Sequence, residues 1–492
     1  MKFVFGNTAD YGEKGISLQI LVHALGSFPM TLLESNSKLT ARRDITMDFT
    51  PWIPIWISNE EQAASYTSEC ERQEALKKYN EWYPDGGYYK NSSNIAVKDS
   101  YILKNNSTQN QTVHVLYPFV SKLKDLNNNI PSLTLNGEIL KTTLHTGSYA
   151  GGFEGVWGGN SKELNEGSVN LSYIENWEGY SSLLSDGTYM KRALGDFVNL
   201  SNIPVTVYEL NDAWGTPENR EEGITNPSIR VMFELDYDKT KVLSYGFGGG
   251  LWDEENGIMG KEFSIRQSGE INYEAPYYII VVGDDIENVS YQGYVTGGWD
   301  TDKKIDAGVT ITRRESNLEE VIRTVAGYSY KTAFDMGYLE GDYDYGFELY
   351  FGLLKEHLMA YSPLSENGVE RYDDGSIEDM DVFGVSRVFW LEAEVTVPAG
   401  SDITVEAVFE KEASYDFYCS NSENSRIKGY DMVTGLGSNL SFTEQTAKLE
   451  DRGQIEIVRQ NFGFDIENGI KEVELDIDEP HYYLEVRAIS VE

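Results

Sequence analysis

The side chains of this sequence that are best suited to chemistry are carboxylates gathered in acidic turns. Asp300, Asp302 and Asp306 follow Trp299, and this spacing lets neighbouring carboxylates converge on Ca2+, which prefers oxygen ligands. The glycine and the final glutamate of an EF-hand loop are absent from this stretch. The turn 373–381 is also dense in acid, so the alternative is that both turns are solvated loops screened by mobile cations. We expect no cofactor other than Ca2+, with Asp300, Asp302 and Asp306 as its candidate ligands.

Carboxylates that lie close to tryptophan form a second pattern. A glycosidase needs two carboxyl groups roughly 5–10 Å apart, and sugar rings stack on aromatic side chains. The candidate combinations are Glu154 with Trp157, Glu175 with Trp177, and Trp252 with Asp253. Nothing in the sequence separates these carboxylates from the many others, and the same aromatic residues could fill β-sandwich cores.

The other chemical groups show no catalytic or metal-binding spacing. The five histidines are His23, His114, His145, His357 and His481, and each stands alone in the sequence. The chain has no His-x-His, His-Glu-x-x-His or Cys-x-x-Cys, the spacings that hold zinc, and no Gly-x-Ser-x-Gly of a serine hydrolase. The glycine-rich run 246–250 lacks the GxGxxG spacing of dinucleotide-binding folds. We therefore expect surface or packing histidines, and whether the chain is an enzyme stays uncertain, leaning towards no.

Charge and composition narrow the classes of partner. The chain has 80 acidic and 40 basic residues, a net charge of −40, and such a surface repels phosphate backbones and anionic lipid headgroups. We expect no nucleic-acid partner, and no apolar stretch is long enough to predict membrane insertion. With 40% hydrophobic and 13% aromatic residues, the 492-residue chain can fill the cores of two to four domains.

The compartment follows from the cysteines and the first residues. Cys70 and Cys419 are too few for a disulfide framework, and we expect two unpaired thiols, although the sequence leaves their pairing open. The first residues lack the apolar core of a signal peptide. The sequence predicts a cytoplasmic protein if it is complete and an extracellular one if a leader was removed.

Hydrophobic periodicity predicts a mainly β fold with a few helices. Apolar residues alternate with polar ones over 389–397 and 403–409, which is typical of antiparallel strands with one buried face. Ser58 and Glu61 form a capping box that predicts a helix near 58–80, and Ser316 with Glu319 forms a second one. We expect multiple antiparallel β-sandwich-like domains with a helical insertion and an N-terminal helix. The predicted division is 1–90 for the N-terminal segment, 91–312 for a β-rich region that could hold two sandwiches, 313–372 for the helical insertion and 373–492 for a C-terminal β-sandwich.

Two stretches carry a resemblance. One runs from Tyr83-Pro84-Asp85-Gly86-Gly87 to Tyr117-Pro118-Phe119, and the other from Gly429-Tyr430-Asp431 through Gly435-Leu436-Gly437 to Asn461-Phe462-Gly463-Phe464-Asp465. They resemble uncharacterised β-rich proteins of Gram-positive bacteria, and the first is also similar to the opening of adhesion-type β-sandwich modules. The resemblance implies a β-rich fold and no particular activity or site residue.

The function that we expect is binding or assembly without catalysis, with a protein or a carbohydrate as the ligand and with self-association as a further expectation. The alternative is a carbohydrate-active enzyme that uses a pair of carboxylates beside aromatic platforms. A cleft with tryptophan and two close carboxylates, one of them in an apolar setting, would favour the enzyme. An aromatic surface exposed at a sheet edge would favour the binding protein.

Overall fold

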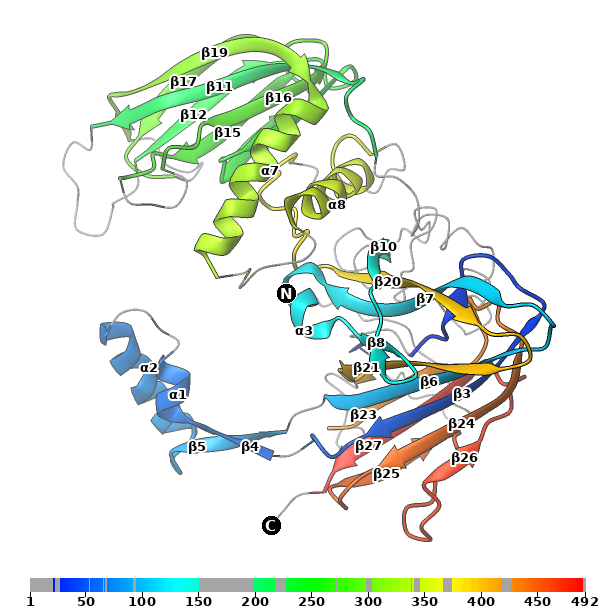
Figure 1. Ribbon diagram of the computed structural model, residues 1–492. Coiled ribbons are helices and arrows are strands. Elements are labelled where there is room, and N and C mark those ends of the chain that lie inside the picture. The colour runs from blue at the N-terminus through cyan, green and yellow to red at the C-terminus, as the bar shows by residue number, and fades with distance from the viewer. Residues whose placement is uncertain are drawn as a thin grey trace.

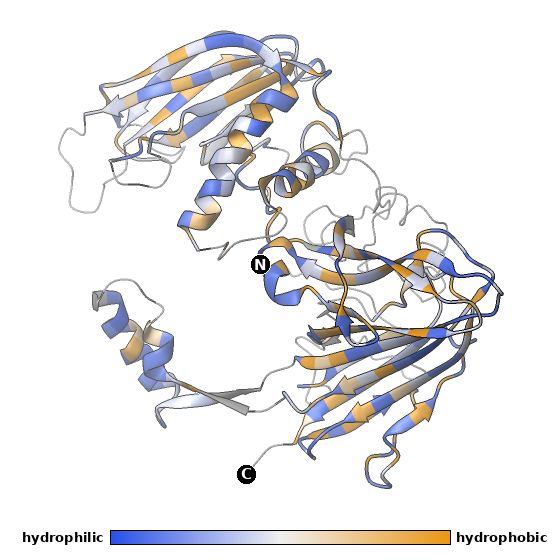
Figure 2. Cartoon of the chain, in the orientation of Figure 1, coloured by the Kyte–Doolittle hydropathy of each residue, from blue (hydrophilic) through white to orange (hydrophobic). Residues whose placement is uncertain are grey.

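The computed structural model describes residues 21–22, 27–52, 54–64, 66, 69–91, 94–149, 198–216, 227–268, 270, 273–297, 303–337, 339, 346–365, 374–416 and 426–489. These residues are mainly β and form multiple antiparallel sheets, as the sequence predicts. Figure 2 shows apolar and polar residues alternating along the strands of these sheets. This alternation leaves one face of each strand for a core.

A central module, residues 204–317, consists of two sheets that share a core (Figure 1). The helix-facing sheet has the order β13 (Thr240–Tyr245), β16 (Tyr277–Gly283), β11 (Pro204–Gly215) and β19 (Ala307–Asn317). The outer sheet has the order β14 (Gly249–Asp253), β15 (Ile258–Ser264), β12 (Ser228–Glu234), β17 (Glu287–Tyr294) and β18 (Lys304–Ile305). Leu210 of β11 and Val231 and Phe233 of β12 belong to the core between them.

Two helices bury the second face of the helix-facing sheet. They are α7 (Leu318–Asp335) and α8 (Gly346–Tyr361). Val207 and Ile280 of the sheet share a core with Ile322 of α7 and Leu354 of α8. The first turn of α7 is capped one residue later than the sequence predicts, because Asn317 rather than Ser316 accepts a hydrogen bond from the Glu320 amide, at 3.0 Å.

Strands from both ends of the chain build the other sheets. The long sheet has the order β26 (Glu472–Glu474), β24 (Phe442–Glu450), β3 (Leu39–Asp48), β6 (Ile95–Asn105), β21 (Asp402–Lys411), β8 (Ser132–Leu135) and β9 (Glu138–Ile139). The β20 sheet has the order β10 (Thr143–Tyr149), β20 (Ser386–Val397), β7 (Gln111–Lys122) and β2 (Thr31–Leu32). The β23 sheet has the order β1 (Leu21–Val22), β22 (Tyr415–Asp416), β23 (Lys428–Val433), β27 (His481–Ala488) and β25 (Ile455–Gln460).

Strand pairing in these sheets crosses the predicted domain boundaries. β20 pairs with β7, and β21 pairs with β6, along most of their lengths. β24 pairs with β3 in the parallel direction. The region 373–492 therefore takes strand partners from residues 39–149, and the central module is inserted between the two sets of strands.

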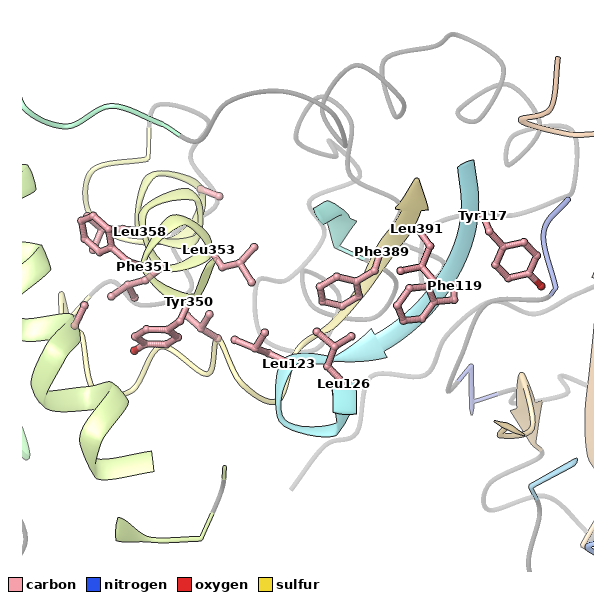
Figure 3. Packing of buried hydrophobic residues seen from close by; sticks show 14 of the residues in the cluster. Tyr117, Phe119, Leu123, Leu126, Tyr350, Phe351, Leu353, Leu358, Phe389 and Leu391 are labelled. Carbon is pink, nitrogen blue, oxygen red and sulfur yellow. The ribbon is translucent and has the colours of Figure 1, made fainter. Parts of the chain in front are cut away.

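A single apolar cluster joins the central module to the β20 sheet and the long sheet. It passes from α8 to the short helices η1 (Leu123–Asp125) and α3 (Leu126–Asn129) and on to β7 and β20. Figure 3 shows this succession, with Tyr350 and Leu353 of α8 on one side and Phe119 with Phe389 on the other. The Phe119 and Phe389 rings stack with centroids 5.7 Å apart. A separate cluster lies between the long sheet and the β23 sheet.

Residues 54–91 form an arm that extends away from the sheets in Figure 1. Its elements are β4 (Pro54–Ser58), α1 (Asn59–Ala64), α2 (Glu69–Trp82) and β5 (Gly87–Asn91). The capping-box contacts at α1 are present, because the Glu61 amide donates to Ser58 Oγ at 3.1 Å and the Ser58 amide donates to Glu61 Oε2 at 3.2 Å. Among the helices of the described residues, none has the length and apolarity to cross a membrane.

Replacing Val395 by aspartate tests which face of β20 is buried in the core. Val395 is 2% exposed in the core between the β20 sheet and the long sheet, and a charge there would have no partner. The variant should lose about 3 kcal/mol or more of unfolding free energy, measured by urea denaturation. Thr396→Asp places the same charge on the exposed face of the strand and should change stability little. Equal stability of the two variants would show that the faces are assigned wrongly.

Candidate functional site

The edge of the central module that is formed by β13 and β14 brings together aromatic, cationic and acidic side chains. β13 ends the helix-facing sheet, β14 ends the outer sheet, and the turn 246–248 joins them. We call this region the edge site and define it by Gly246, Trp252, Lys261, Arg266 and Glu378. Such edges leave backbone groups unpaired, so they are places where a ligand or another segment can add.

Part of the predicted acidic turn covers the β13 side of this edge. The Ser244 amide donates to the Gly375 carbonyl at 2.8 Å, and the Ile377 amide donates to the Ser244 carbonyl at 2.9 Å. Gly375 has φ of +69°, and a Cβ at this position would lie 2.1 Å from the Val242 carbonyl oxygen. The interpretation of this turn as a solvated loop is therefore wrong for residues 374–377, because they extend a sheet edge.

Trp252 provides a flat apolar surface at the site. Its indole lies across Gly250, where an added Cβ would be 2.4 Å from Cη2 of the ring, and 43% of the residue is exposed. The Lys261 ammonium lies 5.3 Å from the ring centroid, and it also donates a hydrogen bond to the Asp374 carbonyl. Trp252 is therefore held by its neighbours while a large part of it still faces solvent.

Glu378 supplies the acid of the site. Its Oε2 atom accepts a hydrogen bond from the Gly246 amide at 2.7 Å, and its side chain reaches solvent. Burial by the surrounding protein raises the pKa of Glu378 above its ordinary value, and the neighbouring charge of Asp379 acts in the same direction. The Gly246 hydrogen bond and the charge of Arg266 oppose this rise.

The side chains of Tyr277 and Arg266 pack closely against Gly246. Its φ is +87°, and an added Cβ would lie 2.6 Å from Cδ1 of Tyr277 and 2.7 Å from Nη2 of Arg266. The Arg266 guanidinium lies 4.3 Å from the Tyr277 ring centroid and donates to the Ala275 carbonyl at 2.6 Å. Only glycine fits at position 246, and this fixes the direction of the amide that binds Glu378.

The predicted calcium ligands are not brought together within the described residues. Asp300 and Asp302 lie outside them, and Asp306 is exposed, with its backbone carbonyl accepting from the Thr216 amide at 2.9 Å. In the second turn, Asp374 accepts a hydrogen bond from the Ser376 amide at 3.0 Å, and Asp381 accepts one from the Gly384 amide at 2.7 Å. No group of three or more His, Cys, Asp or Glu side chains in the described part of the chain is arranged to hold a metal ion. Calcium binding stays a prediction.

Of the three predicted pairs of a tryptophan with a carboxylate, the structure describes only Trp252 with Asp253. Glu154, Trp157, Glu175 and Trp177 lie outside the described residues. Asp253 accepts hydrogen bonds from the Asn256 side chain at 3.0 and 2.8 Å and so closes the turn between β14 and β15. Asp253 is therefore engaged in its own turn, and the fold brings a second acid to this edge, Glu378, which lies 126 positions after Trp252 in the sequence.

Two of the histidines that stand alone in the sequence meet in the structure. His114 and His145 both contact Glu392, at 2.7 and 2.6 Å. Burial alone would raise the pKa of Glu392, but the hydrogen bonds from His145 and His114 outweigh it and lower that pKa. The sequence signal that could have found this group is the alternation of β7 and β20, which puts His114 and Glu392 on polar faces of adjacent strands.

A second polar group is enclosed by the protein. His481 contacts Asp431 at 3.1 Å, and Lys411 donates to the Ser414 hydroxyl at 2.8 Å. Burial lowers the pKa of Lys411 to about 8. All four residues are between 2 and 7% exposed, so this group stabilises the β21–β23 connection and offers no open surface to a ligand.

The raised pKa of Glu378 gives a test of the site. A carboxyl group with a raised pKa binds its proton more tightly in the folded protein, so stability falls as the pH rises from about 4.5 through the raised pKa. Glu378→Gln cannot ionise and should melt slightly above the wild type at pH 7, with no difference at pH 4, because solvent screens much of the effect at this exposed side chain. Glu255→Gln, an exposed carboxylate of the same module, controls for the change in net charge. An equal gain in melting temperature in both variants would contradict the statement that the surroundings of Glu378 raise its pKa.

The chain matches no protein-family model, and no curated protein matches it. The side chains of the edge site are therefore the basis on which a function can be assigned. They offer an exposed indole beside the Lys261 ammonium and, on the adjoining turn, an acid that is bound to the Gly246 amide.

Proposed function

We propose that this protein binds a ligand without transforming it, and that the ligand docks at the edge site with Trp252 as its anchor. The observation that carries the proposal is the Trp252 indole, which lies against Gly250 in β14, the last described strand of the outer sheet, and stays 43% exposed. Leaving a rigid aromatic plane in water is unfavourable, and a ligand that covers it recovers this energy at little cost in side-chain entropy.

A carbohydrate is the ligand class that suits this chemistry best. A sugar ring has a C–H face that can cover the indole and hydroxyl groups that can bond to an exposed polar side chain of the site such as Glu378. The net charge of −40 disfavours polyanionic ligands such as nucleic acids and sulfated glycans. We therefore propose a neutral polysaccharide or oligosaccharide.

The arrangement of the sheets supports a binding scaffold. We propose that the two sheets of the central module form one β-sandwich, and that the long sheet forms others with the β20 and β23 sheets, since each pair shares an apolar core. We assign the expected N-terminal helical element to α1 and α2 of the arm. Self-association stays a prediction, and sedimentation at several protein concentrations would test it.

One observation favours a second candidate, a carbohydrate-active enzyme. Glu378 has a raised pKa and lies next to Asp379, and a carboxyl that keeps its proton can act as a general acid. The two functions differ in outcome, because an enzyme would release reducing ends and would lose this activity in Glu378→Gln. A binding protein would leave the polysaccharide intact.

Substitution of Trp252 tests the proposed function. Trp252→Ala should abolish binding to neutral soluble polysaccharides, with β-glucan, xylan and galactomannan as probes in affinity electrophoresis and calorimetry. The matched control is Trp214→Ala, because Trp214 is 49% exposed and also lies across a glycine, Gly308, on the opposite side of the module. An indole over a glycine also stabilises a strand, so both variants should lose similar amounts of stability.

The outcome that supports the proposal is loss of binding in Trp252→Ala and its retention in Trp214→Ala. Equal binding by the wild type and Trp252→Ala would contradict the assignment of the anchor. Failure of the wild type to bind all three polysaccharides would contradict the ligand class.

A further inference from the structure

β10 is an edge strand that the sheet holds from one side. Among the described strands it pairs only with β20, and it ends the β20 sheet. Its register shifts between Thr146 and Tyr149, so the ladder of backbone hydrogen bonds is interrupted there. A strand with one neighbour and an interrupted ladder opens more easily than a strand in the middle of a sheet. The side chains that fasten β10 therefore matter for the stability of this edge.

Side chains of β10, β20 and β7 meet on the face turned away from the long sheet. The register places Glu394 of β20 opposite His114 of β7, and His145 of β10 lies one diagonal step from Glu392 of β20. His145 Nε2 lies 2.6 Å from Glu392 Oε2, and His114 Nδ1 lies 2.7 Å from Glu392 Oε1. Glu392 is therefore bound to the edge strand through one oxygen and to β7 through the other.

The second nitrogen of His114 also faces an acid. Its Nε2 atom lies 3.5 Å from Glu394 Oε2. A neutral imidazole has one N–H group and would turn a lone pair toward one of the two carboxylates, whereas a protonated ring donates to both. When both histidines are protonated, their charges balance those of Glu392 and Glu394. When both are neutral, two carboxylates stand side by side without this compensation.

Solvent reaches this group of side chains. Those of His114, His145 and Glu392 are 43, 27 and 19% exposed, and that of Glu394 is 65% exposed. An imidazole ordinarily exchanges its proton at about pH 6.5, within the physiological range. The group can therefore follow the pH of its surroundings.

A second contact of β10 does not share this dependence. Arg387 of β20 donates to the Gly147 carbonyl of β10 at 2.8 Å and pairs with Glu356 of α8 at 2.8 Å. Arginine keeps its proton in proteins, so this contact holds one end of β10 in the same way across the range. The end that carries His145 is the pH-dependent one.

We propose that His114, His145, Glu392 and Glu394 form a pH-sensitive latch, which fastens β10 to β20 at mildly acidic pH and loosens as the imidazoles lose their protons. Charge-assisted hydrogen bonds from two imidazolium rings hold Glu392 in the closed state. Loss of the protons weakens these bonds and leaves two neighbouring negative charges. Release of β10 exposes one edge of β20, and an exposed edge can pair with another strand.

The latch also has a lower pH limit. Burial alone would raise the pKa of Glu392, but the hydrogen bonds from His145 and His114 outweigh burial and lower it. A carboxyl group with a lowered pKa stabilises the folded state above its ordinary pKa of 4.5 and loses this contribution as the pH falls through the lowered value. The closed state is therefore favoured most between about pH 4.5 and about pH 6.5.

The alternative is a fixed brace. In that case each neutral imidazole donates its single N–H group to Glu392, and the three strands are tied together equally at every pH. The two interpretations differ in how the opening of β10 depends on pH, which can be measured without a ligand or an activity assay.

The experiment is amide hydrogen exchange of the full chain, measured by mass spectrometry at about pH 5.5 and about pH 8 and corrected for the intrinsic exchange rate. Peptides that cover β10 should be protected about fivefold less at the higher pH, because charged hydrogen bonds become neutral ones. Peptides of β8, in the long sheet, should keep their protection. Glutamine cannot gain a proton, so His145→Gln and Glu392→Gln should remove most of the pH dependence at β10.

Glu444→Gln is the control, because Glu444 is an exposed carboxylate on the long sheet and this variant should keep the wild-type pH dependence. Circular dichroism at both pH values shows whether each variant is folded. The proposal is overturned if β10 of the wild type is equally protected at both pH values, or if β8 loses protection by the same factor. It is also overturned if the folded His145→Gln and Glu392→Gln variants keep the full pH dependence.

Discussion

One buried ion pair, Arg43 with Asp99, joins the long sheet, the β20 sheet and the β23 sheet. Both side chains have no exposure, and the guanidinium makes two hydrogen bonds to the carboxylate, each of 2.8 Å. Arg43 also donates to the Val433 carbonyl at 2.7 Å, and the hydroxyl groups of Tyr101 and Tyr117 donate to Asp99 at 2.8 and 3.2 Å. Removing two charges from water is expensive, so the pair is tolerated only because nearly every donor and acceptor finds a partner. In return it fixes β3, β6, β7 and β23 to each other.

Two other buried arginines of the described residues are neutralised in the same way. Arg230 pairs with Glu262 at 2.5 Å in the outer sheet, and Arg387 pairs with Glu356 at 2.8 Å between β20 and α8. Each pair joins elements that are distant in sequence. The excess of acid is then left largely to the surface, where water and counter-ions reduce its self-repulsion. Lys261 of the edge site is a buried cation held in a different way, because it is 2% exposed and lies against the Trp252 ring while it donates to the Asp374 carbonyl.

The sequence predicts local structure well and long-range pairing poorly. Alternation identifies β20 and β21, and the Ser58–Glu61 capping box marks the start of α1, because both signals depend on neighbouring residues. Alternation also explains why Arg42 is part-exposed beside Asp44 while Arg43 is buried, although the two are adjacent. The partner of β20 is β7, 264 to 286 positions away, and no local pattern encodes that choice.

Sequence reasoning did not find the candidate sites, because local patterns do not encode which distant strands pair. Glu392 meets two histidines that are 278 and 247 positions away, and Glu378 meets Gly246 across 132 positions. Each contact exists only after the strands are in register. Local spacing could test for loops such as an EF-hand, but it could not place carboxylates from separate strands beside one another.

The measurement that tests this account most directly is a double-mutant cycle on Arg43 and Asp99, using urea unfolding of Arg43→Met, Asp99→Asn and the double variant. Each single change leaves a buried partner uncompensated, so each should lose about 3–5 kcal/mol of unfolding free energy. The double variant should lose clearly less than the sum of the two losses. Single variants within about 0.5 kcal/mol of the wild type, or losses that simply add, would contradict the central role of this pair.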